Sequence, residues 1–185
     1  MKKIIYLLLL SLVFACGGPE PRKPIETKSG SFIKESVERN KRLLEEEEVL
    51  IQQYIAIDSI HNYQNSAAGS WYSYEIKNDE ASYTPKEDDL VTLTYNLRSL
   101  NNDTIYSMEE VGVLNYKVDK QELFPGLRSG VKLLKEKETA IFIFPSSMAF
   151  GYHGDNNKIG PNTPIMATIE IFKITKKEDL IEIQN

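Results

Sequence analysis

The chain has 185 residues, a net charge of -5 and a single cysteine. The acidic balance leaves no dominant basic surface, which excludes a nucleic-acid backbone as the main partner. Apolar residues make up 41% of the chain, enough for a packed core, and the length fits one domain or one domain with an extension.

Residues 1–15 have the pattern of a secretory signal. Lys2 and Lys3 precede an apolar run that is too short for a permanent membrane helix, which needs about 20 apolar residues. Because Cys16 follows directly, the segment resembles a bacterial lipoprotein signal, in which the cysteine is lipidated and becomes the new N-terminus. The alternative is an ordinary signal peptide with a chance cysteine. Lipidation at Cys16 implies a protein anchored in the bacterial cell envelope, at the outer membrane and facing the periplasm.

A tether and then a helix are expected next. Residues 16–32 are rich in Gly, Pro and charge, which is typical of a flexible tether. Residues 33–61 lack Gly and Pro, and their apolar side chains recur at helical spacing. The acidic run 45–48 is interpreted as a solvated face, with a metal or partner site as the alternative. The segment 33–60 is a candidate for forming a homodimer, or it packs on its own domain.

The pattern changes to short stretches rich in β-forming residues after a small polar boundary at residues 61–70. We expect one domain over residues 69–175 and a C-terminal tail over 176–185. A single short helix against about five antiparallel strands predicts an α+β fold. The expected strands are 71–76, 90–97, 113–118, 138–144 and 165–174, and the expected short helix is 121–134.

The usual catalytic patterns are missing from this sequence. The two histidines, His61 and His153, are far apart and have no paired ligand spacing, so neither a metal nor a cofactor is expected. The acidic pairs at 88–89 and 109–110 are interpreted as solvated turn residues. The remaining candidates are apolar and aromatic residues spread over several strands and loops, a composition that suits an extended apolar substrate.

Three separated blocks resemble the FKBP-type peptidyl-prolyl isomerases, in the order and spacing of that family. The blocks are PKEDDLVTLTYNL (85–97), KQELFPGLRSGVKLLKEKETAIFIFPSSMAFG (120–151) and IGPNTPIMATIEIFKI (159–174). The resemblance implies an antiparallel half-barrel wrapped around the short helix, with X-Pro peptides as substrates and no cofactor. With its lipoprotein signal and helical extension, the chain looks most like the gliding-motility-associated isomerases of the Bacteroidetes.

The same resemblance implies the residues of the site. Tyr95, Phe124 and Phe150 fall on catalytic positions, where the backbone N–H of Phe124 would bind a substrate carbonyl. The sequence departs from the family at Tyr106, which replaces a carboxylate, and at Phe150, which replaces a phenol. The expected substrate-binding residues are Ile105, Tyr106, Leu114, Leu123, Leu127 (in place of a tryptophan) and Ala167.

Three functions remain open from the sequence. The first is a peptidyl-prolyl cis-trans isomerase that assists the folding of envelope proteins through a divergent pocket, with X-Pro-containing polypeptides as clients. The second is a non-catalytic chaperone or binding module that grips extended apolar chain. The third is a structural component of an envelope assembly that uses the helix over 33–60 to associate.

Overall fold

The computed structural model describes the backbone of residues 29–183 and the side chains of residues 33–180. The expected signal, Cys16 and most of the tether lie outside the described residues. The chain divides into two compact units, residues 1–37 and 38–185, and the second holds all the described strands. Among the described helices, none is long and apolar enough to cross a membrane.

The long helix α2 spans Ser29–Ile57, so it begins inside the segment expected to be tether and ends before residue 61. Beyond its end, the carboxylate of Asp58 accepts hydrogen bonds from the N–H groups of Ile60 (3.0 Å) and His61 (3.2 Å). These bonds satisfy backbone donors as the chain turns away from the helix. Leu44 and other apolar side chains of α2 are exposed, and their pairing with a second copy stays a prediction.

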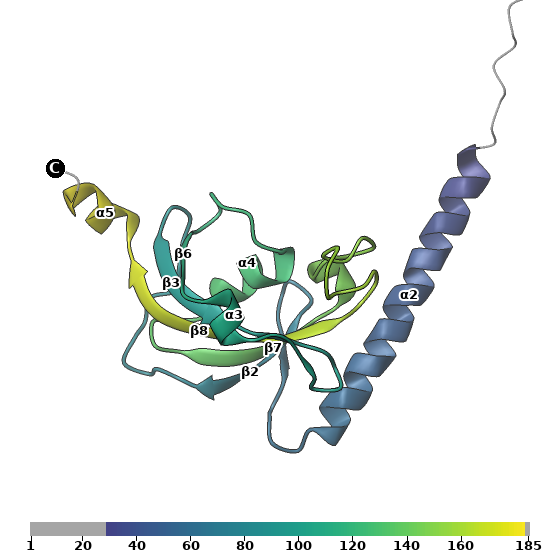
Figure 1. Ribbon diagram of the computed structural model, residues 1–185, viewed down its shortest axis with the longest axis horizontal. Coiled ribbons are helices and arrows are strands. Elements are labelled where there is room, and N and C mark those ends of the chain that lie inside the picture. The colour runs from purple at the N-terminus through teal and green to yellow at the C-terminus, as the bar shows by residue number, and fades with distance from the viewer. Residues whose placement is uncertain (1–28, 184–185) are drawn as a thin grey trace, which may run out of the picture. The chain divides into compact units, whose positions relative to one another are not determined.

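The strands form one antiparallel sheet in the order β1-β2-β7-β8-β3-β6, with β4 pairing with both β8 and β5 (Figure 1). Their bounds are β1 Gln64–Asn65, β2 Trp71–Ile76, β3 Leu90–Tyr95, β4 Leu97–Arg98, β5 Thr104–Tyr106, β6 Leu114–Lys117, β7 Thr139–Phe144 and β8 Ile165–Thr175. The strand expected over 90–97 is interrupted at Asn96. Its backbone N–H donates to the carbonyl of Thr168, while its side-chain oxygen accepts from the Thr168 N–H.

Strand β7 is buried on both of its faces. Alternate residues of a strand point to opposite faces, so its phenylalanines and isoleucines separate. Phe142 and Phe144 join the main core with the buried residues of α4 (Pro125–Val131). Ile141 and Ile143 pack in a second cluster that includes Ile51 of α2. One helix therefore covers each face, and all six residues of β7 are buried.

The start of helix α4 is set by proline. Pro125 has no N–H to leave unpaired at the first helical position, and its φ already suits a helix. Phe124, the N-cap, is in an extended conformation, so the helix is shorter than the 121–134 expected. The helix lies close against β7, since a Cβ atom built on Gly126 would be 2.5 Å from a ring carbon of Phe144. Only glycine fits this contact without displacing the ring.

Three short helical segments complete the fold, which confirms the expected α+β class. Helix α3 (Met108–Val111) begins with a capping box between Ser107 and Glu110. A 3₁₀ turn, η2, spans Ser146–Met148, and helix α5 (Lys177–Ile183) occupies most of the segment expected to be a tail.

The expectation of a solvated acidic pair at 88–89 is wrong for its second member. Asp89 is buried and accepts hydrogen bonds from the Tyr83 hydroxyl (2.7 Å) and from the N–H groups of Lys86 and Lys177 (both 2.9 Å). Burial alone would raise the pKa of this carboxyl, but the three hydrogen bonds outweigh it and lower the pKa. Asp88 has a positive φ of 72°, a conformation that Asp tolerates better than most residues.

We expect Gly126→Ala to lower the free energy of unfolding by about 1–3 kcal/mol, because the added methyl group collides with the ring of Phe144. Gly130→Ala is the matched control on the same helix. Its Cβ would lie 3.1 Å from the Cδ1 atom of Ile169, a milder contact, and alanine favours the helix. Urea unfolding of both variants checks this, and an equal loss of stability in the two would contradict it.

Candidate functional site

The three residues expected to be catalytic come together from separate elements. Tyr95 ends β3, Phe124 caps the start of α4, and Phe150 follows η2. The ring of Phe124 lies between the other two, with centroid distances of 6.3 Å to Tyr95 and 5.2 Å to Phe150. All three side chains are half-buried and pack against the main core. They form an aromatic cluster at the edge of the core, which we call the aromatic wall.

The aromatic wall carries two hydrogen-bond donors. Within the described residues, the backbone N–H of Phe124 has no hydrogen-bond acceptor, which is expected at the start of a helix. Burial raises the pKa of Tyr95, so its phenol stays protonated, and it makes no hydrogen bond to the described part of the chain. An amide donor and a phenol donor thus border an apolar surface, which is suited to holding a peptide carbonyl.

The expected substrate-binding residues divide into three groups. Ile105, Tyr106 and Leu123 are half-buried and pack against the main core, as the residues of the aromatic wall do. Leu114 is half-buried on β6, where it pairs with Leu93. Leu127 and Ala167 have no exposed surface and belong to the main core. The last two would contact a proline ring only if the rings above them moved aside.

A carboxylate lies beside Tyr106 although the sequence replaces the expected one. The Tyr106 hydroxyl donates to Oδ2 of Asp155 and accepts a hydrogen bond from the amide of Asn157 (3.0 Å). The other oxygen of Asp155 accepts from the N–H groups of Asn157 (2.9 Å) and Ile159 (2.7 Å). Burial would raise the pKa of Asp155, but these bonds dominate and lower it, so the group is ionised at neutral pH.

The loop over residues 154–159 is held at several points. Lys158 donates to the carbonyl of Ile105 (3.0 Å) and to the carboxylate of Glu110 (2.8 Å), and its ammonium lies 4.6 Å from the Tyr106 ring centroid. Gly154 has a φ of 69°, and a Cβ built there would lie 2.2 Å from the carbonyl oxygen of Ile159. The loop therefore folds back tightly on itself beside the aromatic wall.

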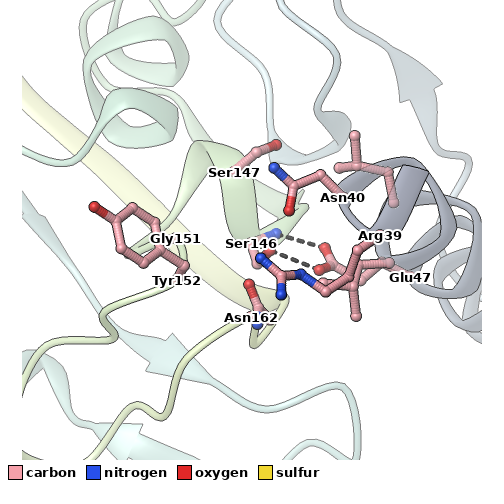
Figure 2. Close-up of a pocket in the computed structure, with 10 residues that line it drawn as sticks. Arg39, Asn40, Glu47, Ser146, Ser147, Gly151, Tyr152 and Asn162 are labelled. Carbon is pink, nitrogen blue, oxygen red and sulfur yellow. Dashed lines mark hydrogen bonds between the residues drawn. The ribbon is translucent and has the colours of Figure 1, made fainter. Parts of the chain in front are cut away.

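A pocket of about 870 Å³ lies next to the aromatic wall, between α2 and the segment 146–152. Figure 2 shows Glu47 of α2 on one side of it, joined by hydrogen bonds to Ser146 on the other. The pocket contains none of the predicted site residues, and it reaches the wall only through Gly151, the neighbour of Phe150. We take the aromatic wall as the candidate site, because the three residues expected to be catalytic come together there and none of them lines this pocket.

Neither histidine contributes to the aromatic wall. His61 forms a 2.8 Å contact with Asp58. The pKa of Asp58 is lowered to about 2, because hydrogen bonds from His61, Ile60 and Tyr63 outweigh the opposing effect of burial. His153 is exposed, and its ring centroid lies 3.8 Å from that of Tyr152, with the two rings tilted by 39°. Residues 33–180 contain no cluster of His, Cys, Asp or Glu suited to a metal ion.

Two features of this region were not anticipated from the sequence. Asp155 is one polar residue in a polar loop, and only its contact with Tyr106, 49 positions away, distinguishes it. Glu47 is hidden in the acidic run 45–48, where four consecutive glutamates give no sign of which one faces the domain. A helical projection that placed Glu47 on the same face as Ile51 was the available signal.

Comparison with known families identifies the same region of the chain. Residues 81–172 match the family model of the FKBP-type peptidyl-prolyl cis-trans isomerases. A curated relative from Neisseria meningitidis serogroup B, the probable FKBP-type peptidyl-prolyl cis-trans isomerase FkpA, is 28% identical over 135 residues. The alignment covers 73% of this chain and 47% of the relative, so the chain spans about half the length of that protein.

Solved structures show the same fold at low sequence identity. FkpA from Escherichia coli has a TM-score of 0.59 at 17% identity, covering 96% of this chain and 84% of that one. A peptidyl-prolyl cis-trans isomerase from Pseudomonas syringae pv. tomato has a TM-score of 0.59 at 17% sequence identity, covering 74% of this chain and 96% of that one. The N-terminal domain of FKBP42 from Arabidopsis thaliana has a TM-score of 0.55 at 15% sequence identity, covering 62% of this chain and 94% of that one. These similarities confirm the expected FKBP-like fold.

We expect the hydrogen bonds of the loop to weaken in acid, because the folded-state pKa of Asp155 lies below its ordinary value. Their stabilisation is complete above about pH 4 and is lost as the pH falls through the lower, folded-state pKa. Asp155→Asn should lower the hydrogen-exchange protection of the Asn157 and Ile159 amides at neutral pH by about tenfold, the size of one charged hydrogen bond. Asp79→Asn, at an exposed position, is the control. Equal protection in Asp155→Asn and the unsubstituted protein would refute the assignment.

Proposed function

We propose that this protein isomerises X-Pro peptide bonds in polypeptide clients, since residues 81–172 match the family model of the FKBP-type peptidyl-prolyl cis-trans isomerases. The observation that carries the proposal is the aromatic wall, where the free N–H of Phe124 lies beside the rings of Tyr95 and Phe150.

The chemistry needs neither a cofactor nor a proton transfer. The barrier to rotation about a peptide bond is about 18–20 kcal/mol, because rotation breaks the resonance of the amide. The twisted amide is less polar along its C–N bond than the planar one, so an apolar surface favours it over the ground state. The Phe124 N–H holds the carbonyl of the residue before proline, and the rings of the aromatic wall contact the proline itself.

The protonated phenol of Tyr95 supplies a second donor on the β3 side of the wall. The polar groups around Tyr106 lie at the margin and do not replace the missing phenol at position 150. Because a neutral hydrogen bond contributes about 1 kcal/mol net, the absence of that phenol slows the reaction without preventing it. The proposed enzyme is therefore a slow isomerase.

Restoring the family's phenol should accelerate the reaction. We expect Phe150→Tyr to raise kcat/KM by about 2- to 10-fold, the range that one neutral hydrogen bond implies. NMR exchange spectroscopy on X-Pro peptides, without a coupled protease, measures the rate. Phe172→Tyr adds the same hydroxyl to an exposed phenylalanine of β8 and should leave the rate unchanged. Exchange no faster than background at high protein concentration would eliminate the isomerase proposal.

A non-catalytic chaperone is the second candidate, and the burial of Leu127 and Ala167 favours it. With no exposed surface at these two positions, neither residue is available to contact a proline ring. Such a face would hold extended apolar chain without twisting an amide. This candidate predicts that the protein suppresses client aggregation to the same extent with and without Phe150→Tyr, while peptide exchange stays at background.

We propose further that the protein is a lipoprotein of the bacterial cell envelope, held through Cys16 and acting on clients in the periplasm. The signal-like pattern of residues 1–15 motivates this, as does its similarity to the gliding-motility-associated isomerases. Cys16→Ser should abolish incorporation of labelled palmitate and shift the protein from the membrane to the soluble fraction of bacteria. Membrane association that survives this substitution contradicts the lipid anchor.

A further inference from the structure

One glutamate of the acidic run does not face solvent. Glu45, Glu46 and Glu48 are exposed, whereas Glu47 is only 5% exposed. Its two carboxylate oxygens accept from the backbone N–H of Ser146 (2.8 Å) and from the hydroxyl of the same serine (2.6 Å). Figure 2 shows this carboxylate aimed at Ser146 across the junction between α2 and η2. The expectation that the whole run is solvated is therefore wrong at Glu47.

Ser146 in turn fixes the backbone on both sides of Phe150. Its carbonyl oxygen accepts hydrogen bonds from the N–H of Ala149 (3.0 Å) and from that of Gly151 (2.8 Å). These two residues flank Phe150 directly. Any displacement of Ser146 is therefore passed to the residues that carry the Phe150 ring, which lies 5.2 Å from the ring of Phe124.

Within the described residues, the Ser146 N–H has no acceptor other than Glu47, and Ser146 is itself only 5% exposed. A buried donor that loses its acceptor is strongly unfavourable, so removal of the Glu47 carboxylate forces this segment to rearrange or to admit water. The carboxylate thus holds the backbone and the side chain of Ser146, the first residue of η2.

We infer that Glu47 is a positioning residue of the site: through Ser146 it holds Phe150 in the aromatic wall. The inference rests on the proposed isomerase function for its kinetic consequence, while its structural part stands on the two hydrogen bonds. It also gives α2 a role in the site, because a residue outside the FKBP-type match at 81–172 sets the geometry within it. Glu47 acts through Ser146 and has no contact with substrate in this scheme.

The only tryptophan of the chain reports separately on whether α2 stays in place. Trp71 packs in the second cluster with Ile51, which lies one helical turn after Glu47. If a change at Glu47 separates α2 from the second cluster, the environment of Trp71 changes and its fluorescence emission shifts. If the change moves only Phe150, α2 stays packed on the cluster and the emission of Trp71 is unchanged.

The test compares four variants of the full-length protein. Glu47→Ala removes both hydrogen bonds, and Ser146→Ala removes only the one from the hydroxyl. Glu47→Gln is the conservative variant, since its amide oxygen can accept from the N–H while its amide nitrogen donates to the hydroxyl. Glu46→Gln is the matched control, because it makes the same change at an exposed neighbour.

We expect Glu47→Ala to weaken the NMR cross-peaks between the Phe124 and Phe150 rings and to lower kcat/KM at least about tenfold, as misplacement of a binding group does. Ser146→Ala should show a smaller effect of the same kind. Glu47→Gln should recover most of the loss, and Glu46→Gln should change nothing. The Trp71 emission should match the unsubstituted protein in all four variants.

Two results overturn the inference. One is Glu47→Ala with unchanged ring cross-peaks. The other is a loss of cross-peaks that occurs only in variants whose Trp71 emission also shifts, which would mean that Glu47 holds α2 on the domain and does not position Phe150. If Glu47→Ala does not fold, Ser146→Ala carries the same test. An unsubstituted protein without isomerase activity refutes the proposed function, yet the ring cross-peaks still decide whether Glu47 positions Phe150.

Discussion

The burial of β7 on both faces is the constraint on which the rest of the structure depends. A strand with two apolar faces needs a cover on each, and α4 and α2 supply them. The cover by α4 brings Phe124 to the edge of the core. The cover by α2 brings Glu47 to the end of the same strand, where Ser146 begins η2. Helix α4 thus contributes to the aromatic wall directly, through its N-cap Phe124, whereas α2 is connected to the segment that carries Phe150 through Ser146.

The region around the aromatic wall differs in two polar positions from the pattern of the family that the sequence resembles. The position expected to carry a carboxylate holds Tyr106, and a carboxylate from the loop over 154–159 bonds to its hydroxyl. The polar pair is therefore assembled from two segments, and it fastens the loop. The hydrogen-bonding capacity of this pair is largely used within the protein, whereas the N–H of Phe124 and the phenol of Tyr95 have no acceptor among the described residues.

Much of the fold was readable from the sequence, because the strands follow alternation and the turns follow Gly, Pro and Asn. The helix over 121–134 was expected too long, since apolar spacing continues upstream of Pro125 while the backbone does not. Helix α3 was missed although its Ser107-x-x-Glu110 capping box is visible in the sequence. The three residues expected to be catalytic lie near one another in the structure, while their catalytic role stays a prediction. Helical periodicity can place Glu47 on the face of Ile51, but it does not name Ser146 as the partner, and nothing periodic marks the contact of Asp155 with Tyr106.

The neighbouring aspartates at the start of β3 hold the C-terminal helix by two bonds of different character. The buried carboxylate of Asp89 accepts a hydrogen bond from the backbone N–H of Lys177. The more accessible carboxylate of Asp88 forms an ion pair with the Lys177 ammonium at 2.9 Å. Dissolved salt screens a surface ion pair and scarcely affects a buried hydrogen bond. Rising ionic strength would therefore loosen the side chain of Lys177 while its backbone stays attached. The start of α5 can thus lose its ion pair without detaching from β3.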